Sequence, residues 1–282
     1  MLFTEKHLNL FNNRIYVRIA TSQNVKPKLA IVLIHGLGDH SGRYMDWMEK
    51  FEDLGVVWVT ADLPGHGLSS GKRGCFRTIE CPFKIVEHLI TLAKNRFEGL
   101  PIILYGHSMG GNICANFVIQ KSPKIDGLIL TSPWLGLINR PPNWKIELAK
   151  LVSPLLKNMT LKTGVMREQL TFNEKALDNF EKDNLIHGKI TLGTFLIMWD
   201  AAFYIRKNAL SIKIPTLLLH GTSDTITNWK TTMRFGLKIR QISKFKSFDG
   251  MLHELHHDAN NNMVAKEITK WLNNTFLQQY GF

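Results

Sequence analysis

This chain of 282 residues has little of what marks several large protein classes. Its three cysteines, Cys75, Cys81 and Cys114, are too few and too scattered for a disulfide framework, so a reducing cytoplasm is the expected compartment. No run approaches the roughly 18 apolar residues of a membrane span, and residues 1–7 show no basic region followed by an apolar one. Secretion and transmembrane anchoring are therefore not expected, and no internal repeat is apparent.

Acidic residues are scarce relative to basic ones. Lys and Arg number 35 against 23 Asp and Glu, which gives a formal net charge of +12. The basic residues occur as singles or pairs, without a basic block and without interleaved aromatic residues, so nucleic-acid binding is not expected. An anionic lipid surface is the better candidate partner for this charge.

Short apolar runs alternate with helix-length segments, which predicts an α/β protein with a mostly parallel sheet flanked by helices. The runs at 29–34 and 216–220 are apolar throughout, as expected of central strands covered on both faces. The alternation at 15–19 favours an exposed antiparallel edge strand instead. The other strand-like runs are 56–60, 102–105, 127–131 and 245–248. Ligands of such sheets bind beyond the carboxyl ends of the strands.

The alternation stops between residues 134 and 206, where helical patterns replace strands. We expect residues 1–133 and 207–282 to form the core and residues 134–206 to form an inserted helical cap. One predicted cap helix carries an apolar stripe with lysines at its margins. This stripe either packs against the core or contacts a lipid surface. It consists of Trp144, Leu148, Leu151, Val152 and Leu155, flanked by Lys145, Lys150 and Lys157.

The most informative segment is Gly106-His107-Ser108-Met109-Gly110. It follows an apolar run and precedes a helical pattern, so the serine is placed at a strand-to-helix corner. A serine nucleophile at such a corner needs small neighbours, because the backbone turns sharply there and strand and helix approach closely. The segment therefore predicts that Ser108 is the nucleophile of a hydrolase.

A serine nucleophile needs a histidine base and an acid that orients the imidazole. With the chain order serine, acid, histidine, Asp224 is the best acid, because it lies in a turn directly after the strand 216–220. His253 is the best base, since it lies in a loop beyond the last strand, with His256 and His257 as nearby competitors.

Acyl transfer also requires donors for the oxyanion of the tetrahedral intermediate. The backbone amide of Met109 follows the serine at the start of a helix. The amide of Leu37 lies in the glycine-rich loop after the central strand 29–34. These two amides are the candidate oxyanion hole.

A second pattern overlaps the histidine segment. His253-Glu254-Leu255-His256-His257 matches H-E-x-x-H, the helical zinc motif of metallopeptidases, in which His253 and His257 would bind the metal. The first histidine directly follows a glycine turn, and no third ligand follows at the usual spacing. The preferred interpretation is that the chain binds no metal.

Together these segments resemble the α/β-hydrolases of the monoacylglycerol lipase and lysophospholipase group. The resemblance covers nearly the whole chain and rests on residues 35–44, 61–74, 106–111 and 132–133 and on the segments around Asp224 and His253. It implies an eight-stranded sheet, a cap over Ser108, no cofactor, and hydrolysis of an acyl ester whose chain lies in an apolar tunnel. It also implies that His35 orients the oxyanion loop.

We therefore expect a serine hydrolase that acts on single-chain lipid esters, with monoacylglycerol lipase as the preferred activity. Lysophospholipase, other carboxylesterase and acyltransferase activities share the same residues and stay open. A ligand-binding protein on a hydrolase fold and a zinc metallopeptidase are the alternatives from other classes. Head group, acyl chain and oligomeric state are left open by the sequence.

Overall fold

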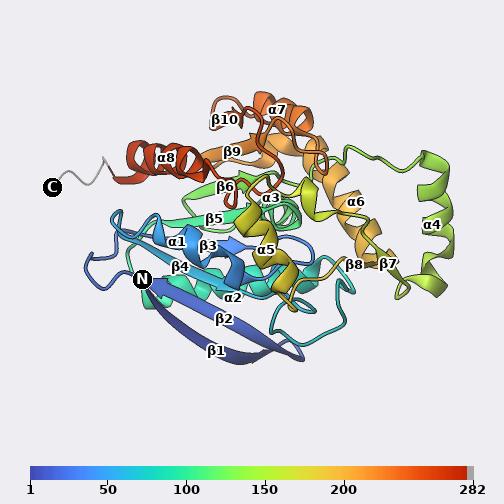
Figure 1. The fold of residues 1–282 in the computed structure, drawn as a ribbon, viewed down its shortest axis with the longest axis horizontal. Helices are drawn as coiled ribbons and strands as arrows, with labels where there is room; N and C mark the ends of the chain where they lie inside the picture. Colours follow the sequence, from blue (N-terminus) through green and yellow to red (C-terminus); the bar gives the residue numbers. More distant parts are fainter. Residues whose placement is uncertain (278–282) are drawn as a thin grey trace.

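A computed structural model describes residues 1–277 of the chain. Its centre is an eight-stranded sheet with the order β1-β2-β4-β3-β5-β6-β9-β10. β1 and β2 are antiparallel to their neighbours and the other strands are parallel, which confirms the expected α/β-hydrolase architecture (Figure 1). The strands are β1 (Leu2–Leu10), β2 (Asn13–Thr21), β3 (Leu29–Ile34), β4 (Val56–Ala61), β5 (Ile102–His107), β6 (Gly127–Thr131), β9 (Thr216–Gly221) and β10 (Ser243–Phe248).

Helices cover both faces of the sheet because its central strands are apolar on both sides. In β3, Ala30, Val32 and Ile34 belong to one core cluster, which is covered by α2, α3, α6 and α7. Leu29, Ile31 and Leu33 belong to the other, which is covered by α1 and α8. These helices are α1 (Met45–Glu49), α2 (Glu80–Arg96), α3 (Met109–Lys121), α6 (Leu192–Lys207), α7 (Trp229–Lys238) and α8 (Asn261–Leu272); the short turns are η1 (Ser41–Tyr44), η3 (Ala209–Ser211) and η4 (Asn273–Leu277).

The expectation of an exposed edge strand at residues 15–19 is wrong. β2 is antiparallel, but it lies second in the sheet, because β1 pairs with it along Leu2–Leu10 and forms the edge. Residues 15–20 are therefore buried. The apolar pattern did not indicate β1, because the middle of this strand is polar.

The chain between β6 and β9 adds no strand to the main sheet. It contains α4 (Asn143–Leu156), α5 (Glu174–Lys182), α6 and the turn η2 (Arg167–Gln169), with β7 (Thr160–Lys162) and β8 (Lys189–Thr191) paired in a separate small sheet. The last helix, α6, packs on α3, and its Met198, Ala202 and Ile205 belong to the core cluster on that face. The part of 134–206 that stands off the core thus ends before α6.

Helix α4 projects from the rest of the molecule (Figure 1). Most of its apolar stripe does not pack against the core, so that alternative is wrong: Leu151 and Leu155 are 77% and 90% exposed. Val152 is half-buried against Leu192 and Leu196, and Ile146, outside the stripe, is the buried residue of the helix. Trp144 and Leu148 are also exposed.

Across residues 1–277, no helix combines the length and the apolar character that a bilayer crossing requires. Cys114 is buried in α3, as expected, whereas Cys75 and Cys81 are half-buried.

Candidate active site

Ser108 lies at the corner between β5 and α3, and its backbone has φ of +54°. A non-glycine residue rarely adopts this conformation, so the surrounding packing must impose it. Gly106 and Gly110 allow the close approach: a Cβ atom on Gly110 would lie 2.1 Å from the carbonyl oxygen of Ile34, and one on Gly106 would lie 2.5 Å from that of Gly110. The small residues of the segment are therefore required by contact between strand and helix.

The three side chains expected to act together converge beyond the carboxyl ends of β5, β9 and β10. The Oγ atom of Ser108 lies 2.9 Å from Nε2 of His253, and Nδ1 of His253 lies 2.7 Å from Oδ2 of Asp224. An ionised carboxylate only accepts hydrogen bonds, so Nδ1 of His253 donates and Nε2 is left to accept from the serine hydroxyl. This is the geometry of a serine nucleophile with its base.

Asp224 is held as an anion by several donors. Its Oδ1 accepts from the amides of Ile226 and Thr227, and its Oδ2 accepts from His220 Nε2 at 3.0 Å and the Thr227 hydroxyl at 2.7 Å. Burial alone would raise the pKa of Asp224, but the charge of His253 and the bonds from both histidines outweigh it. The pKa of Asp224 therefore lies well below its usual value.

The pKa of His253 moves in the opposite direction. Burial favours the neutral imidazole, but the neighbouring Asp224 carboxylate raises the pKa of His253 above its ordinary value. Burial and the nearby His253 lower the pKa of His107 to about 3, so this second imidazole beside Ser108 stays uncharged. Of these two imidazoles, His253 is therefore the more basic.

The two candidate oxyanion donors, the amides of Leu37 and Met109, come from two separate parts of the chain. Leu37 follows β3 in a loop that lines the same pocket as Ser108, and Met109 is the first residue of α3. Neither amide donates to a protein acceptor among the residues described. His35 is buried, and its Nε2 atom accepts a hydrogen bond from the amide of Leu63 at 2.9 Å. This bond connects the start of the loop that carries Leu37 to the chain that follows β4.

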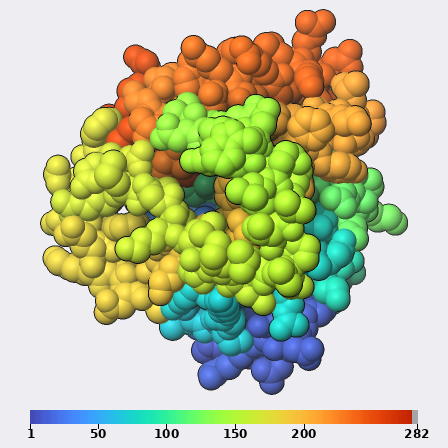
Figure 2. Space-filling view, turned by 90° about the vertical axis from the view of Figure 1, so that its right-hand side faces the viewer, coloured from blue at the N-terminus to red at the C-terminus, as the bar shows by residue number. Residues whose placement is uncertain are grey.

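A pocket of about 700 Å³ opens over Ser108 and His253. Figure 2 shows a hollow on this face, framed by the parts of the chain that follow β6. Most of the apolar lining comes from the segment 134–206, including Trp134, Leu137, Ile146, Leu161, Ile190 and Phe195. The site thus places a hydroxyl group that is hydrogen-bonded to an imidazole beside an apolar space of a size that suits a ligand.

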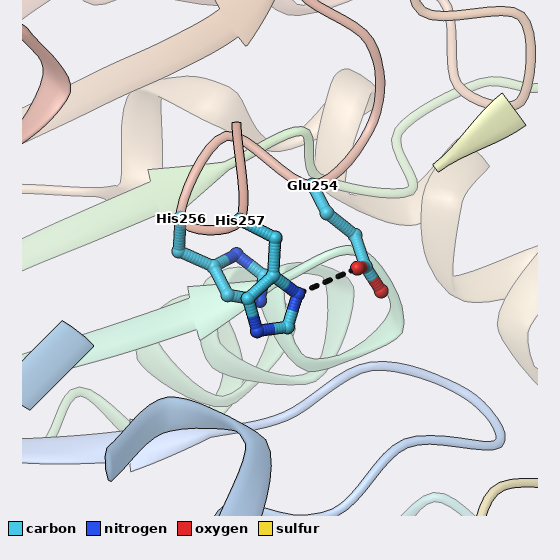
Figure 3. Close-up of side chains that lie close together, drawn as sticks. All are labelled: Glu254, His256 and His257. Atoms are coloured by element: carbon cyan, nitrogen blue, oxygen red, sulfur yellow. Dashed lines mark hydrogen bonds and ion pairs between the residues drawn. The ribbon is translucent and has the colours of Figure 1, made fainter. Parts of the chain in front are cut away.

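The H-E-x-x-H segment does not form the helical zinc motif, because residues 251–260 form turns rather than a helix. His253 uses both ring nitrogens on Ser108 and Asp224. Glu254, His256 and His257 do cluster within 4.8 Å (Figure 3). However, both carboxylate oxygens of Glu254 accept from the Arg43 guanidinium, at 2.7 and 2.6 Å. The Arg43 guanidinium therefore already takes the two Glu254 oxygens that a metal ion would need as ligands.

The sequence patterns did not predict three residues that hold the side chains of the site in place. His220 and Thr227 hold Asp224, and Arg43 holds Glu254 beside His253. Of these three, His220 could have been suspected from the sequence, because it lies near the carboxyl end of β9, where ligands of such sheets bind. Arg43 lies more than 200 residues from Glu254 in the chain, so no local pattern connects the two.

Comparisons with known proteins find similarity over most of this chain. The family described as serine aminopeptidase, S33, matches residues 25–260. An uncharacterized abhydrolase domain-containing protein of Dictyostelium discoideum is 28% identical over 251 residues, which are 88% of this chain but 26% of that protein. A monoglyceride lipase homolog of Monkeypox virus is 29% identical over 94% of this chain and 96% of its own length. The crystal structure of Paleococcus ferrophilus monoacylglycerol lipase has a TM-score of 0.82 and 30% identity, covering 92% of this chain and 99% of that one.

Proposed function

Because this chain belongs to the serine aminopeptidase S33 family of α/β-hydrolases, we propose that it hydrolyses esters of single-chain lipids, with monoacylglycerols as preferred substrates. The chain is a hydrolase of the lipase and esterase type. The observation that carries the proposal is the chain of hydrogen bonds from Ser108 through His253 to Asp224 at the base of an apolar pocket.

In the proposed mechanism, Ser108 Oγ attacks the ester carbonyl carbon while its proton passes to Nε2 of His253. The amides of Leu37 and Met109 stabilise the oxyanion, and Asp224 stabilises the imidazolium. His253 then protonates the leaving glycerol oxygen, which leaves an acyl group on Ser108. Water, deprotonated by His253, attacks this acyl group and releases the fatty acid, so that the serine regains its proton.

The lining of the pocket favours an ester over a peptide with a free amino terminus. Recognition of an ammonium group requires a free carboxylate, but each of the four carboxylates that line this pocket already has a basic side chain as partner. Asp39 and Glu254 pair with Arg43, Glu181 pairs with Arg167, and Asp183 pairs with His40. The apolar wall opposite them suits an acyl chain.

The segment 134–206 is proposed to act as a cap, with α6 as its anchor on the core. Helix α4 then supplies the contact with a lipid surface, because its exposed apolar stripe is flanked by lysines, as in helices that lie at membrane interfaces. Such contact would let a lipid ester pass from the membrane into the pocket.

A lysophospholipid is the second candidate substrate. Lys145 and Lys162 line the same pocket as Ser108, and either ammonium group would attract a phosphate in the head group. Matched substrates with one acyl chain and either a glycerol or a phosphoglycerol head group separate the two candidates by their kcat/KM.

The experiment that tests the function compares wild type with Ser108→Ala on monoacylglycerols, measuring released fatty acid. We expect a loss of about 10⁴- to 10⁶-fold in kcat, as for removal of a serine nucleophile elsewhere. A fluorophosphonate should label wild type but not the variant. Equal turnover by both proteins would refute the proposed mechanism, and activity that a chelator abolishes would favour metal chemistry instead.

A further inference from the structure

A second large cavity lies outside the active-site pocket, beside α4. Its volume is about 1160 Å³, and its walls come from the β1–β2 turn, the loop 64–78, the start of α2 and the facing parts of α4 and α6. In Figure 2 the cyan part of the chain lies directly below the yellow-green segment that contains α4. Neither Ser108 nor His253 lines this cavity, so the proposed ester hydrolysis does not account for it.

The cavity has an excess of positive charge. Its acidic side chains are already paired: Glu80 lies 2.9 Å from Lys121, and Asp200 lies 3.2 Å from Lys150. Within residues 1–277, no ion pair joins the remaining cations of the wall to a carboxylate. These cations are Lys72, Arg77, Lys84 and Lys157.

The remaining cations of the wall could bind a phosphate group, and the other residues of the cavity wall suit the organic part of a phosphate ester. Thr78 and Ser153 bring hydroxyl groups to the cavity, and Lys84 lies 5.3 Å above the ring of Phe11. Apolar side chains of the core complete the lining, namely Phe76, Ile85, Leu196 and Ile197. Exposed cations beside hydroxyl groups and buried apolar side chains fit a phosphate ester better than a free inorganic ion.

The position of α4 identifies the source of such a phosphate. Lys150, Ser153 and Lys157 line the cavity from the same helix whose Leu151 and Leu155 are exposed. An interfacial helix buries its apolar face about 5–10 Å into the boundary between head groups and acyl chains. At about 3.6 residues per turn, Lys150, Ser153 and Lys157 lie on the face of α4 opposite this apolar stripe, together with the buried Ile146. That face is about one helix diameter, about 10 Å, farther from the acyl chains, so the cavity wall that these residues form lies in the head-group layer.

We propose that this cavity binds the phosphate head group of an anionic phospholipid in the membrane on which α4 docks. The inference rests on the proposed docking of α4 on a membrane. It adds a defined binding site for one lipid head group to the general attraction between basic residues and an anionic surface. The bound lipid is not the substrate, because the cavity is separate from the pocket over Ser108. It instead holds the protein on anionic membranes with α4 against the bilayer.

Vesicle flotation tests the site with phosphatidylcholine vesicles that contain or lack phosphatidylglycerol. For Arg77→Gln/Lys84→Gln we expect binding to the anionic vesicles to weaken about 10- to 30-fold, from the usual contribution of basic residues near such a surface. The matched control is Lys266→Gln/Lys270→Gln, two exposed lysines of α8 at the opposite end of the molecule (Figure 1). Its binding should change less than about twofold, although its net charge is the same.

Equal losses in the two variants would overturn the proposal, because net charge alone would then explain the binding. Saturable binding of inorganic phosphate, without preference for anionic vesicles, would assign the cavity to a soluble phosphate and also overturn it. If the double variant fails to fold, Lys157→Gln replaces it, with about fivefold weaker binding expected. Hydrolysis of monoacylglycerol in detergent micelles by wild type reports on the proposed function separately, since no anionic lipid is present there.

Discussion

Arg43 holds Glu254, the residue after His253, through two hydrogen bonds of 2.7 and 2.6 Å, and it also donates to Asp39 at 3.0 Å. All three side chains are buried. Burial alone would raise the pKa of Asp39 and Glu254, but the Arg43 guanidinium holds both well below their usual range. This cluster joins the loop that carries Leu37 to the loop that carries the candidate base.

Replacing Arg43 with Met should destabilise the protein by about 3–5 kcal/mol at neutral pH, because two buried carboxylates lose their partner. Without Arg43, burial raises the pKa of both carboxyl groups, so the folded variant binds more protons than folded wild type. The loss of stability should therefore grow as pH rises from acid to neutral. Urea unfolding at several pH values measures it.

The matched control for this change is Arg240→Met, at an exposed position, which should alter the unfolding free energy by less than about 0.5 kcal/mol. A loss of stability in Arg43→Met that stays constant with pH would contradict the assigned charge interaction.

Asp224→Asn should lower kcat about 10⁴-fold, since the amide no longer holds the imidazole in the reactive tautomer. It should also move the acid limb of the pH profile. His253 acts as a base when neutral, so activity falls as pH drops through its pKa, which Asp224 raises. Without that carboxylate the pKa of His253 falls, and the residual activity should persist to lower pH.

The exposed Asp249, in the neighbouring turn, supplies the control for this profile. Asp249→Asn should leave both the rate and the acid limb as in wild type. An unmoved limb in Asp224→Asn would show that another group controls the profile.

Gly110→Ala should destabilise the fold although alanine is the better helix former. The added Cβ would lie 2.1 Å from the carbonyl oxygen of Ile34 and 2.5 Å from that of His35, and these backbone atoms at the end of β3 cannot move aside as a flexible side chain could. We expect a loss of about 1–3 kcal/mol in the free energy of unfolding, together with reduced activity at the adjacent Ser108. Gly188→Ala is the control, because its Cβ would approach no closer than 3.5 Å and its φ is not positive. Equal thermal midpoints for the two variants would contradict the steric argument.

The sheet and the corner at Ser108 were predictable because both depend on local patterns. The apolar runs at 29–34 and 216–220 mark strands buried on both faces, and the glycines around Ser108 mark a close backbone approach. Asp224 and His253 could be predicted to lie near Ser108 because each follows the carboxyl end of a strand, and the carboxyl ends of parallel strands meet at one edge of the sheet. Their roles as catalytic residues stay predictions, as does the cytoplasmic location.

The sequence could not predict what depends on contacts between distant segments. β1 is polar and is a strand because it pairs with β2, so no apolar run identified it. The pairing of Arg43 with Glu254 likewise requires the folded sheet to bring two loops together. Helix α4 was recognised as amphipathic, but whether its apolar face met the core or solvent depended on where the segment 134–206 was placed.

The exposed face of α4 yields a prediction that separates lipid contact from folding. Leu151→Asn/Leu155→Asn should leave the unfolding free energy within about 0.5 kcal/mol of wild type, since these side chains are 77% and 90% exposed. Binding to phosphatidylcholine vesicles should weaken about 10²- to 10⁴-fold, because each of the two leucines buried in the interface contributes about 1.5–3 kcal/mol. Ile146→Asn provides the opposite case, since this residue is 4% exposed and its change should destabilise the fold. Unchanged vesicle binding in the double variant would mean that α4 is not the contact with lipid.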